Sequence, residues 1–275
     1  MKTVVITGST RGIGYGLADA FLELGCQMAV SGRTPEGIEQ ALKRLSEGRG
    51  KKHLLGRTCD VTDIDQLQTL WDTALSHFGK VDIWINNAGL GHFPRDWWQM
   101  PPEEIRSVVE TNVIGAMYGA RVALAGMRKQ DFGALYNMEG MGSDGRKVAG
   151  MALYGSTKSA LGYLTDALAK EVKGSPIIVG ALRPGMVATD LVTKPYEGRP
   201  EEWAKVKGIF NILSDRVETV TPWLAGKILA NRKNGLRITW LTNRKLMWRF
   251  LTAPIRKRDV FGDQTISFLI QLSAF

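Results

Sequence analysis

Short apolar runs rich in β-branched residues alternate along the chain with longer stretches in which apolar residues recur every three or four positions. The first pattern is typical of buried strands and the second of amphipathic helices. Strands are predicted at residues 4–7, 28–31, 54–58, 81–85, 134–137, 177–182 and 236–239. Crossover helices are predicted at 62–78, 102–128 and 153–173. This alternation predicts one α/β domain over residues 1–275: a doubly wound, Rossmann-type sheet of seven parallel strands with helices on both faces.

The regular alternation of strand and helix patterns ends after Pro184. Residues 190–230 contain three prolines and are predicted to form inserted helices. Insertions at the carboxyl ends of parallel strands commonly cover a ligand pocket, so this segment is expected to lie over the substrate.

Residues 231–275 are predicted to form a basic, amphipathic C-terminal segment. The net charge of the chain is +9, and residues 231–258 alone hold nine Lys and Arg with no Asp or Glu. Apolar and aromatic residues interleave with these cations between Leu241 and Leu251. One hypothesis is docking on an anionic membrane or pigment-protein surface, and the other is an oligomer contact. Nucleic acid is not expected, because no binding module accompanies the charge.

Cysteine content and the start of the chain bear on the compartment. Cys26 and Cys59 are the only cysteines and are predicted to be reduced core residues. The first strand follows Met1 and Lys2 directly, so no targeting peptide is expected, and no apolar run approaches the ~20 residues of a spanning helix. A cytoplasmic protein, at most peripheral at a membrane, is predicted.

The histidines are not spaced as metal ligands. His53, His77 and His92 show no such spacing with one another or with the cysteines, so no metal site is expected. A surface position is expected for His92.

A glycine-rich turn joins the first strand to the first helix, with Gly8, Gly12 and Gly14 in the spacing Gly-x3-Gly-x-Gly. Glycines here let the backbone approach a pyrophosphate, whose charge is met by the helix N-terminus. The alternative is a tight turn that binds nothing.

Three ordered motifs, namely this turn, Asn86-Asn87-Ala88-Gly89 and Tyr154-x3-Lys158, resemble those of the short-chain dehydrogenase/reductase family over almost all of residues 1–190. The resemblance implies a nicotinamide cofactor, with the adenine near Asp60 and Val61 and the carboxamide near the loop after residue 183. The implied cofactor-binding residues are Gly8, Ser9, Gly12, Ile13, Gly14, Asp60, Val61, Asn87, Ala88, Gly89, Tyr154, Lys158, Pro184, Gly185, Val187 and Thr189.

The end of the second strand indicates which cofactor binds. NAD-dependent enzymes place an acid there to hold the ribose hydroxyls, whereas this chain reads Ser31-Gly32-Arg33. Arg33 and Arg11 are therefore predicted to bind the 2′-phosphate of NADPH, because arginine pairs bidentately with phosphate. Either arginine alone could be a solvated surface residue, but the two together, in place of the acid, favour NADPH.

Tyr154 and Lys158 are four residues apart in a predicted helix and so share one face. A free phenol has a pKa of about 10, and a nearby ammonium together with a positive nicotinamide is expected to lower it. Tyr154 would then protonate a carbonyl oxygen as hydride arrives, while Lys158 holds the ribose. By the resemblance, Asn112 supports a water relay to the lysine.

The family's catalytic serine is missing. Gly140 or Met141 stands in its place, and the nearest hydroxyl is that of Ser143. Either Ser143 substitutes through a reshaped loop, or Tyr154 and backbone amides alone hold the substrate oxygen.

The loop Asn137–Arg146, which lacks the family's serine, and the segment Pro184–Leu191 are similar to those of the chlorophyll b reductase subgroup. That similarity implies NADPH-dependent reduction of the C7 formyl group of chlorophyll b and a homo-oligomer, dimeric or tetrameric. The alternatives are a general carbonyl reductase or alcohol dehydrogenase for another bulky apolar substrate, and a non-catalytic NADPH-binding scaffold. Aromatic and methionine side chains near the site suit a flat ring or serve as ordinary packing: Phe93, Trp97, Trp98, Met141, Met186, Trp203 and Phe210.

Overall fold

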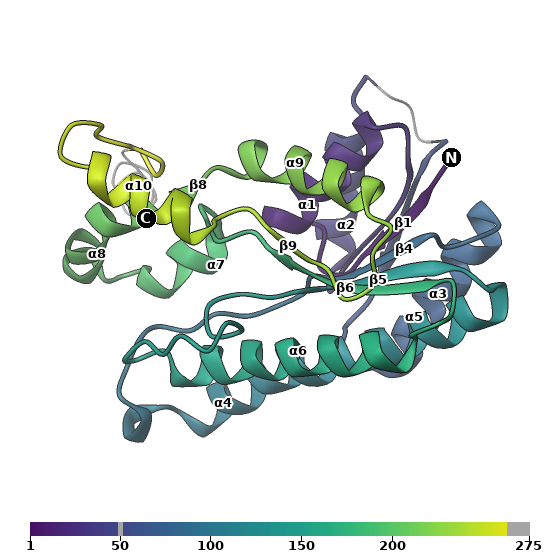
Figure 1. Ribbon diagram of the computed structural model, residues 1–275, viewed down its shortest axis with the longest axis horizontal. Coiled ribbons are helices and arrows are strands. Elements are labelled where there is room, and N and C mark those ends of the chain that lie inside the picture. Colours follow the sequence, from purple (N-terminus) through teal and green to yellow (C-terminus); the bar gives the residue numbers. More distant parts are fainter. Residues whose placement is uncertain (49–51, 263–275) are drawn as a thin grey trace.

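A computed structural model describes residues 1–48 and 52–262. Its main sheet has seven strands in the order β3-β2-β1-β4-β5-β6-β9, and every neighbouring pair is parallel. The prediction of a doubly wound sheet is thereby confirmed (Figure 1). The strands are β1 (Thr3–Ile6), β2 (Gln27–Gly32), β3 (Leu54–Thr58), β4 (Ile83–Asn86), β5 (Gly133–Met138), β6 (Ile177–Arg183) and β9 (Arg237–Thr239).

Helices cover both faces of this sheet. One layer is formed by α1 (Gly12–Glu23), α2 (Pro35–Ser46) and α9 (Val217–Ala230), and the other by α3 (Ile64–Phe78), α4 (Pro102–Val109), α5 (Gly115–Gln130) and α6 (Ala152–Glu171). Alternate residues of β1 point to opposite layers: Val4 and Ile6 join one buried cluster, and Val5 joins the other. This period of two is what a strand buried on both faces requires.

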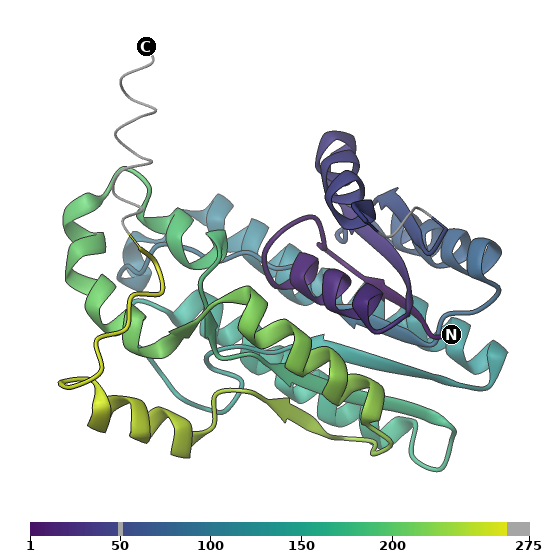
Figure 2. The ribbon, with the colours of Figure 1, turned by 90° about the horizontal axis from the view of Figure 1, so that it is seen from above.

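The segment 190–230 divides into two parts with different roles. Residues 190–213 form α7 (Asp190–Thr193), a 3₁₀ turn (Lys194–Tyr196) and α8 (Pro200–Leu213), outside the two layers. By contrast, α9 lies beside α1 and buries Val220 and Leu224 in the core (Figure 2). The prediction that the whole segment covers a pocket is therefore wrong for α9, because its apolar face is needed to close the sheet.

The C-terminal segment is partly structural. β9 is an edge strand of the main sheet, and α10 (Asn243–Thr252) follows it. A short pair, β7 (Met186–Val187) and β8 (Ser214–Asp215), joins the loop after β6 to the end of α8. The predicted segment 231–275 extends beyond the described residues, since 263–275 lie outside them. No helix among the described residues has the length and apolar character needed to cross a bilayer.

Candidate active site

The glycine turn between β1 and α1 has the close backbone packing that a pyrophosphate cradle needs. Gly8 and Gly12 have φ angles of +64° and +57°, which residues other than glycine rarely adopt. A Cβ added at Gly14 would lie 2.5 Å from the Gly8 carbonyl oxygen. The turn therefore fits a dinucleotide phosphate at the N-terminus of α1.

Ser9 anchors this turn to the sheet. Its hydroxyl donates to the Ile6 carbonyl (2.7 Å) and accepts from the Ser31 amide (2.9 Å), while its own amide donates to the Ser31 carbonyl (2.8 Å). Ser9 is fully buried. The hydroxyl and amide of Ser9 are thus used to fix the turn to β1 and β2.

The predicted cofactor residues from other strand ends converge on the glycine turn. The Asn87 side chain donates to the carbonyls of Thr7 (2.9 Å) and Gly8 (3.0 Å). A Cβ at Gly8 would lie 2.9 Å from Ala88 Cα, and one at Gly12 would lie 3.4 Å from Thr189 Cγ2. The ends of β1, β4 and β6 therefore meet at one place.

The remaining predicted residues of this site lie around that meeting point. Asp60 accepts hydrogen bonds from the Thr62 amide and hydroxyl, and the buried Val61 packs where a Cβ at Gly115 would lie. Gly185 has a φ of +75°, and Leu241 packs against it. The backbone between β6 and β7, which begins at Pro184, is held close to the β9 side of the sheet.

Arg11 and Arg33 are both exposed at the cofactor end of the sheet. Arg11 lies 3.5 Å from the Asp190 carboxylate, an exposed pair that contributes little to stability. Sequence reasoning missed a third guanidinium, that of Arg44, which donates to the Thr10 carbonyl (3.2 Å) and lies over the Tyr15 ring. Because this contact joins residues 34 positions apart, no local pattern reveals it.

Tyr154 and Lys158 lie in the first turns of α6, and Asn112 faces them from a π-helical turn. The Lys158 ammonium donates to the Met138 carbonyl (2.9 Å) and lies 5.6 Å from the centre of the Tyr154 ring. The Asn112 amide bridges the backbone of Leu90 at both its N–H and its C=O. The π turn, residues 110–114, interrupts the predicted continuous helix 102–128, and such turns often mark functional sites.

Burial sets the protonation preferences of Tyr154 and Lys158. It raises the pKa of Tyr154 to about 12 and lowers the pKa of Lys158 to about 8, although attraction from Glu139 opposes the second change. In the chain alone desolvation dominates for the phenol, and Lys158 donates to the Met138 carbonyl; the expected lowering of the phenol's pKa, which also involves the positive nicotinamide, stays a prediction.

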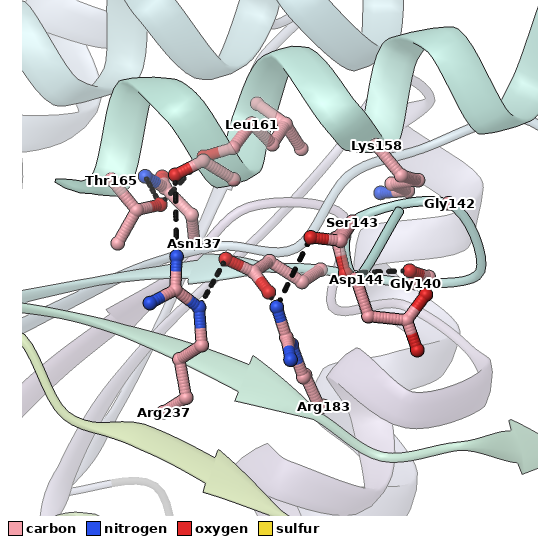
Figure 3. Close-up of polar contacts among 12 residues, drawn as sticks. Asn137, Gly140, Gly142, Ser143, Asp144, Lys158, Leu161, Thr165, Arg183 and Arg237 are labelled. Carbon is pink, nitrogen blue, oxygen red and sulfur yellow. Dashed lines mark hydrogen bonds and ion pairs between the residues drawn. The ribbon is translucent and has the colours of Figure 1, made fainter. Parts of the chain in front are cut away.

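Gly140 occupies the place nearest the tyrosine hydroxyl. A Cβ built at Gly140 would lie 2.7 Å from Tyr154 Oη, which is closer than real contacts allow. The Ser143 hydroxyl donates to the Gly140 carbonyl within its own loop (2.7 Å; Figure 3). Its hydrogen is therefore donated within the loop rather than to Tyr154, and the tyrosine hydroxyl lies in the space that a side chain at position 140 would take.

A buried acid that sequence reasoning did not single out fixes this loop. Glu139 accepts from Arg183 Nε (2.5 Å) and forms an ion pair with Arg237 (3.4 Å). Arg183 also donates to the Ser143 carbonyl (3.2 Å). Figure 3 shows both arginines reaching from β6 and β9 toward the loop beneath α6. Buried charge thus ties the reshaped loop to β6 and β9, in addition to the hydrogen bonds that the Ser143 and Ser159 hydroxyls donate to the Gly140 and Gly142 carbonyls.

His92 is buried, which corrects the expectation that it lies at the surface. Its Nε2 accepts a hydrogen bond from the backbone amide of Tyr154 (3.2 Å), and its Nδ1 lies 2.8 Å from the Phe93 carbonyl. Both contacts are satisfied by the neutral tautomer that carries its proton on Nδ1. Because Met151 provides no side-chain cap for α6, His92 supplies an acceptor to the turn that carries the tyrosine.

The aromatic residues near the site pack mostly against one another. Phe93, Trp203 and Phe210 each contact Tyr196 at ring separations of 5.4–5.9 Å. They therefore form a cluster that supports the α7–α8 segment. Trp97 and Trp98 are 53% and 81% exposed.

Comparison with known proteins bears on the identity of this site. The profile described as short chain dehydrogenase matches residues 2–200. The chloroplastic chlorophyll(ide) b reductase NOL of Oryza sativa subsp. japonica is 36% identical over 98% of this chain and 78% of its own length. The probable chlorophyll(ide) b reductase NYC1 of the same organism is 32% identical over 96% of this chain. The chain spans only about half of that relative, 54% of its length.

Solved structures of other proteins share the fold of this chain. The 3-ketoacyl-(acyl-carrier-protein) reductase from Brucella melitensis, complexed with NADH, gives a TM-score of 0.73 at 26% identity, covering 86% of this chain and 96% of its own. A variant of actinorhodin polyketide ketoreductase with NADPH gives 0.76 at 25% identity over 86% of this chain and 95% of its own. Both nicotinamide cofactors therefore occur among its structural neighbours.

Proposed function

Because this chain belongs to the short chain dehydrogenase family of oxidoreductases, we propose that it is an NADPH-dependent reductase of the C7 formyl group of chlorophyll b. The observation that carries the reaction class is the convergence of Tyr154, Lys158 and Asn112 beside the glycine turn. The substrate is supported by the chlorophyll(ide) b reductases that match nearly the whole chain.

The chain supplies the proton and the positioning for this reaction. A bound NADPH would supply the hydride. Tyr154 Oη would donate its proton to the formyl oxygen, which becomes the hydroxyl of the hydroxymethyl product. The Lys158 ammonium, buried and held by the Met138 carbonyl, would bind the ribose hydroxyls and stabilise the phenolate that remains.

The absence of the family's serine from this loop bears on how the substrate oxygen is held. With no side chain at Gly140 and the Ser143 hydroxyl donating to the Gly140 carbonyl, the hydroxyl that lies beside this position is that of Tyr154. We favour an oxygen held by Tyr154 and backbone amides over the alternative in which Ser143 replaces the family serine. Ser143→Ala should then retain most of the turnover, whereas a loss of 100-fold or more would restore Ser143 as a catalytic residue.

The cofactor preference is supported by two arginines and the absence of an acid at the end of β2. Arg11 and Arg33 are exposed, as groups that receive a 2′-phosphate must be, and Arg11 would exchange its contact with the Asp190 carboxylate for the phosphate. Arg33→Asp should weaken NADPH binding at least tenfold, because a bond between charged groups is worth about 1.5–3 kcal/mol, and should leave NADH binding equal or tighter. Fluorescence titration of both cofactors measures this, and equal loss for both would contradict it.

The substrate is tested by anaerobic incubation of the purified protein with NADPH and chlorophyll b, followed by pigment chromatography. The proposal predicts 7-hydroxymethyl chlorophyll a, formed only when NADPH is present. If NADPH binds but no product forms, the pigment assignment fails, and a panel of bulky apolar carbonyl compounds would identify the substrate of the same site.

A further inference from the structure

The helix α10 has its charged side inward and its apolar side outward. Arg249 is 9% exposed, whereas Trp248 and Leu251 are 60% and 67% exposed. An amphipathic helix on a water-soluble protein normally has the opposite arrangement. The exposed apolar residues are called here the α10 face: Met247, Trp248, Phe250, Leu251 and Ile255.

A buried carboxylate fixes this orientation. Asp215, in β8, accepts from Arg249 Nη2 (2.5 Å), from Arg258 Nη2 (2.8 Å) and from Trp240 Nε1 (2.6 Å). Burial opposes its ionisation, but the hydrogen bonds from Arg249 and Trp240 outweigh burial and lower the pKa of Asp215. The ion pairs would have to break before α10 could turn its apolar side inward.

The rim of the α10 face is cationic. Arg244, Arg256 and Lys257 are exposed, and residues 231–258 contain no acid that could neutralise them. Asp215 engages Arg249 and Arg258, so the charges left exposed along residues 256–259 and at Arg244 are these three cations and one acid, Asp259.

We propose that the α10 face docks on the surface of an anionic lipid bilayer. Tryptophan, leucine and methionine side chains bury well at the headgroup boundary, where arginine and lysine meet lipid phosphates. A neutral apolar partner would leave the cations unpaired, and a nucleic acid would leave the apolar side chains in water. An anionic bilayer satisfies both.

The place of α10 in the fold determines which edge of the protein would face the bilayer. α10 packs against α8, which lies with α7 beyond the carboxyl ends of the strands, the same edge at which α6 begins (Figure 1). A protein seated on its α10 face would hold this edge toward the bilayer. That the docking serves capture of a membrane-held pigment rests on the proposed function; the docking itself does not.

Vesicle flotation of the full chain tests the proposal without any pigment. Wild-type protein should float at least tenfold more with vesicles of phosphatidylcholine containing phosphatidylglycerol than with pure phosphatidylcholine. The double variant Trp248→Glu/Leu251→Glu should lose this binding at least tenfold. Leu24→Glu is the matched control, because Leu24 is 50% exposed at the far end of α1, and it should float like the wild type.

Other results would overturn the proposal. These are equal flotation of the double variant and wild type, no flotation of wild type with either vesicle, or a lipid-free dimer in sedimentation that the double variant dissociates. If the double variant fails to fold, judged by circular dichroism and NADPH binding, Met247→Gln/Ile255→Gln takes its place with the same expectation. Flotation without chlorophyll b reduction would refute the proposed function and leave the docking supported.

Discussion

Gly140 is the position at which a single methyl group should reveal how Tyr154 works. In Gly140→Ala, the new Cβ would lie 2.7 Å from Tyr154 Oη, and the tyrosine hydroxyl must retreat by about 0.7 Å to reach an ordinary contact of 3.4 Å. A displacement of this order at a reacting atom costs roughly 10- to 100-fold in kcat, or about 1.4–2.7 kcal/mol. The φ angle of Gly140 is not positive, so alanine adds no backbone strain.

The matched control is Gly155→Ala. A Cβ at Gly155, beside the tyrosine on α6, would meet nothing within 4 Å. Steady-state turnover and NADPH affinity are measured for both variants. Gly140→Ala should lose kcat with NADPH affinity within about twofold of wild type, whereas Gly155→Ala should keep both. Unchanged kcat in Gly140→Ala would refute the view that the space left at Gly140 places the tyrosine.

Three further outcomes follow from buried polar contacts. His92→Leu should lower kcat about tenfold at nearly constant NADPH affinity, because Tyr154 loses the acceptor for its amide, and His92→Gln, whose side-chain carbonyl can accept that bond, should restore most of it. Asp215→Asn should lower the free energy of unfolding by about 3 kcal/mol at pH 7 in urea titration, since it leaves Arg249 buried without its counter-charge. The lowered pKa of Asp215 stabilises the fold above about pH 4, so this difference should shrink as the pH falls through the carboxyl's folded-state pKa; a pH-independent difference would contradict the ion-pair explanation. Lys158→Met should raise the free energy of unfolding without cofactor by about 2–3 kcal/mol at pH 7, because burial lowers the lysine's pKa to about 8 and disfavours its charged form. That gain should disappear as the pH rises from about 8 toward 10.5, and its absence at pH 7 would show that the ammonium is not desolvated.

The strands and the cofactor motifs were predictable because their signals are local. Most strands are short runs of buried apolar residues, as in β1, and the glycines of the turn are spaced by the backbone geometry that they make possible. β9 was also predictable, from Ile238 and its neighbours, although it lies within the basic segment.

The contacts that tune the site were not predictable, because they join distant residues. The bond from Tyr154 to His92 spans 62 positions and depends on how the loop after β4 packs against α6. The inward orientation of Arg249 is set by Asp215, 34 residues earlier, so a helical pattern alone assigns the wrong face to solvent. The π turn at 110–114 likewise depends on tertiary contacts of Asn112.

The central claim is that Tyr154 transfers the proton in an NADPH-dependent reduction of chlorophyll b. The most direct measurement compares wild type with Tyr154→Phe in anaerobic pigment turnover while NADPH binding is titrated in parallel. The account predicts that the phenylalanine variant binds NADPH with nearly unchanged affinity and forms at least 10²-fold less 7-hydroxymethyl chlorophyll a. Product formation at the wild-type rate by Tyr154→Phe would contradict it.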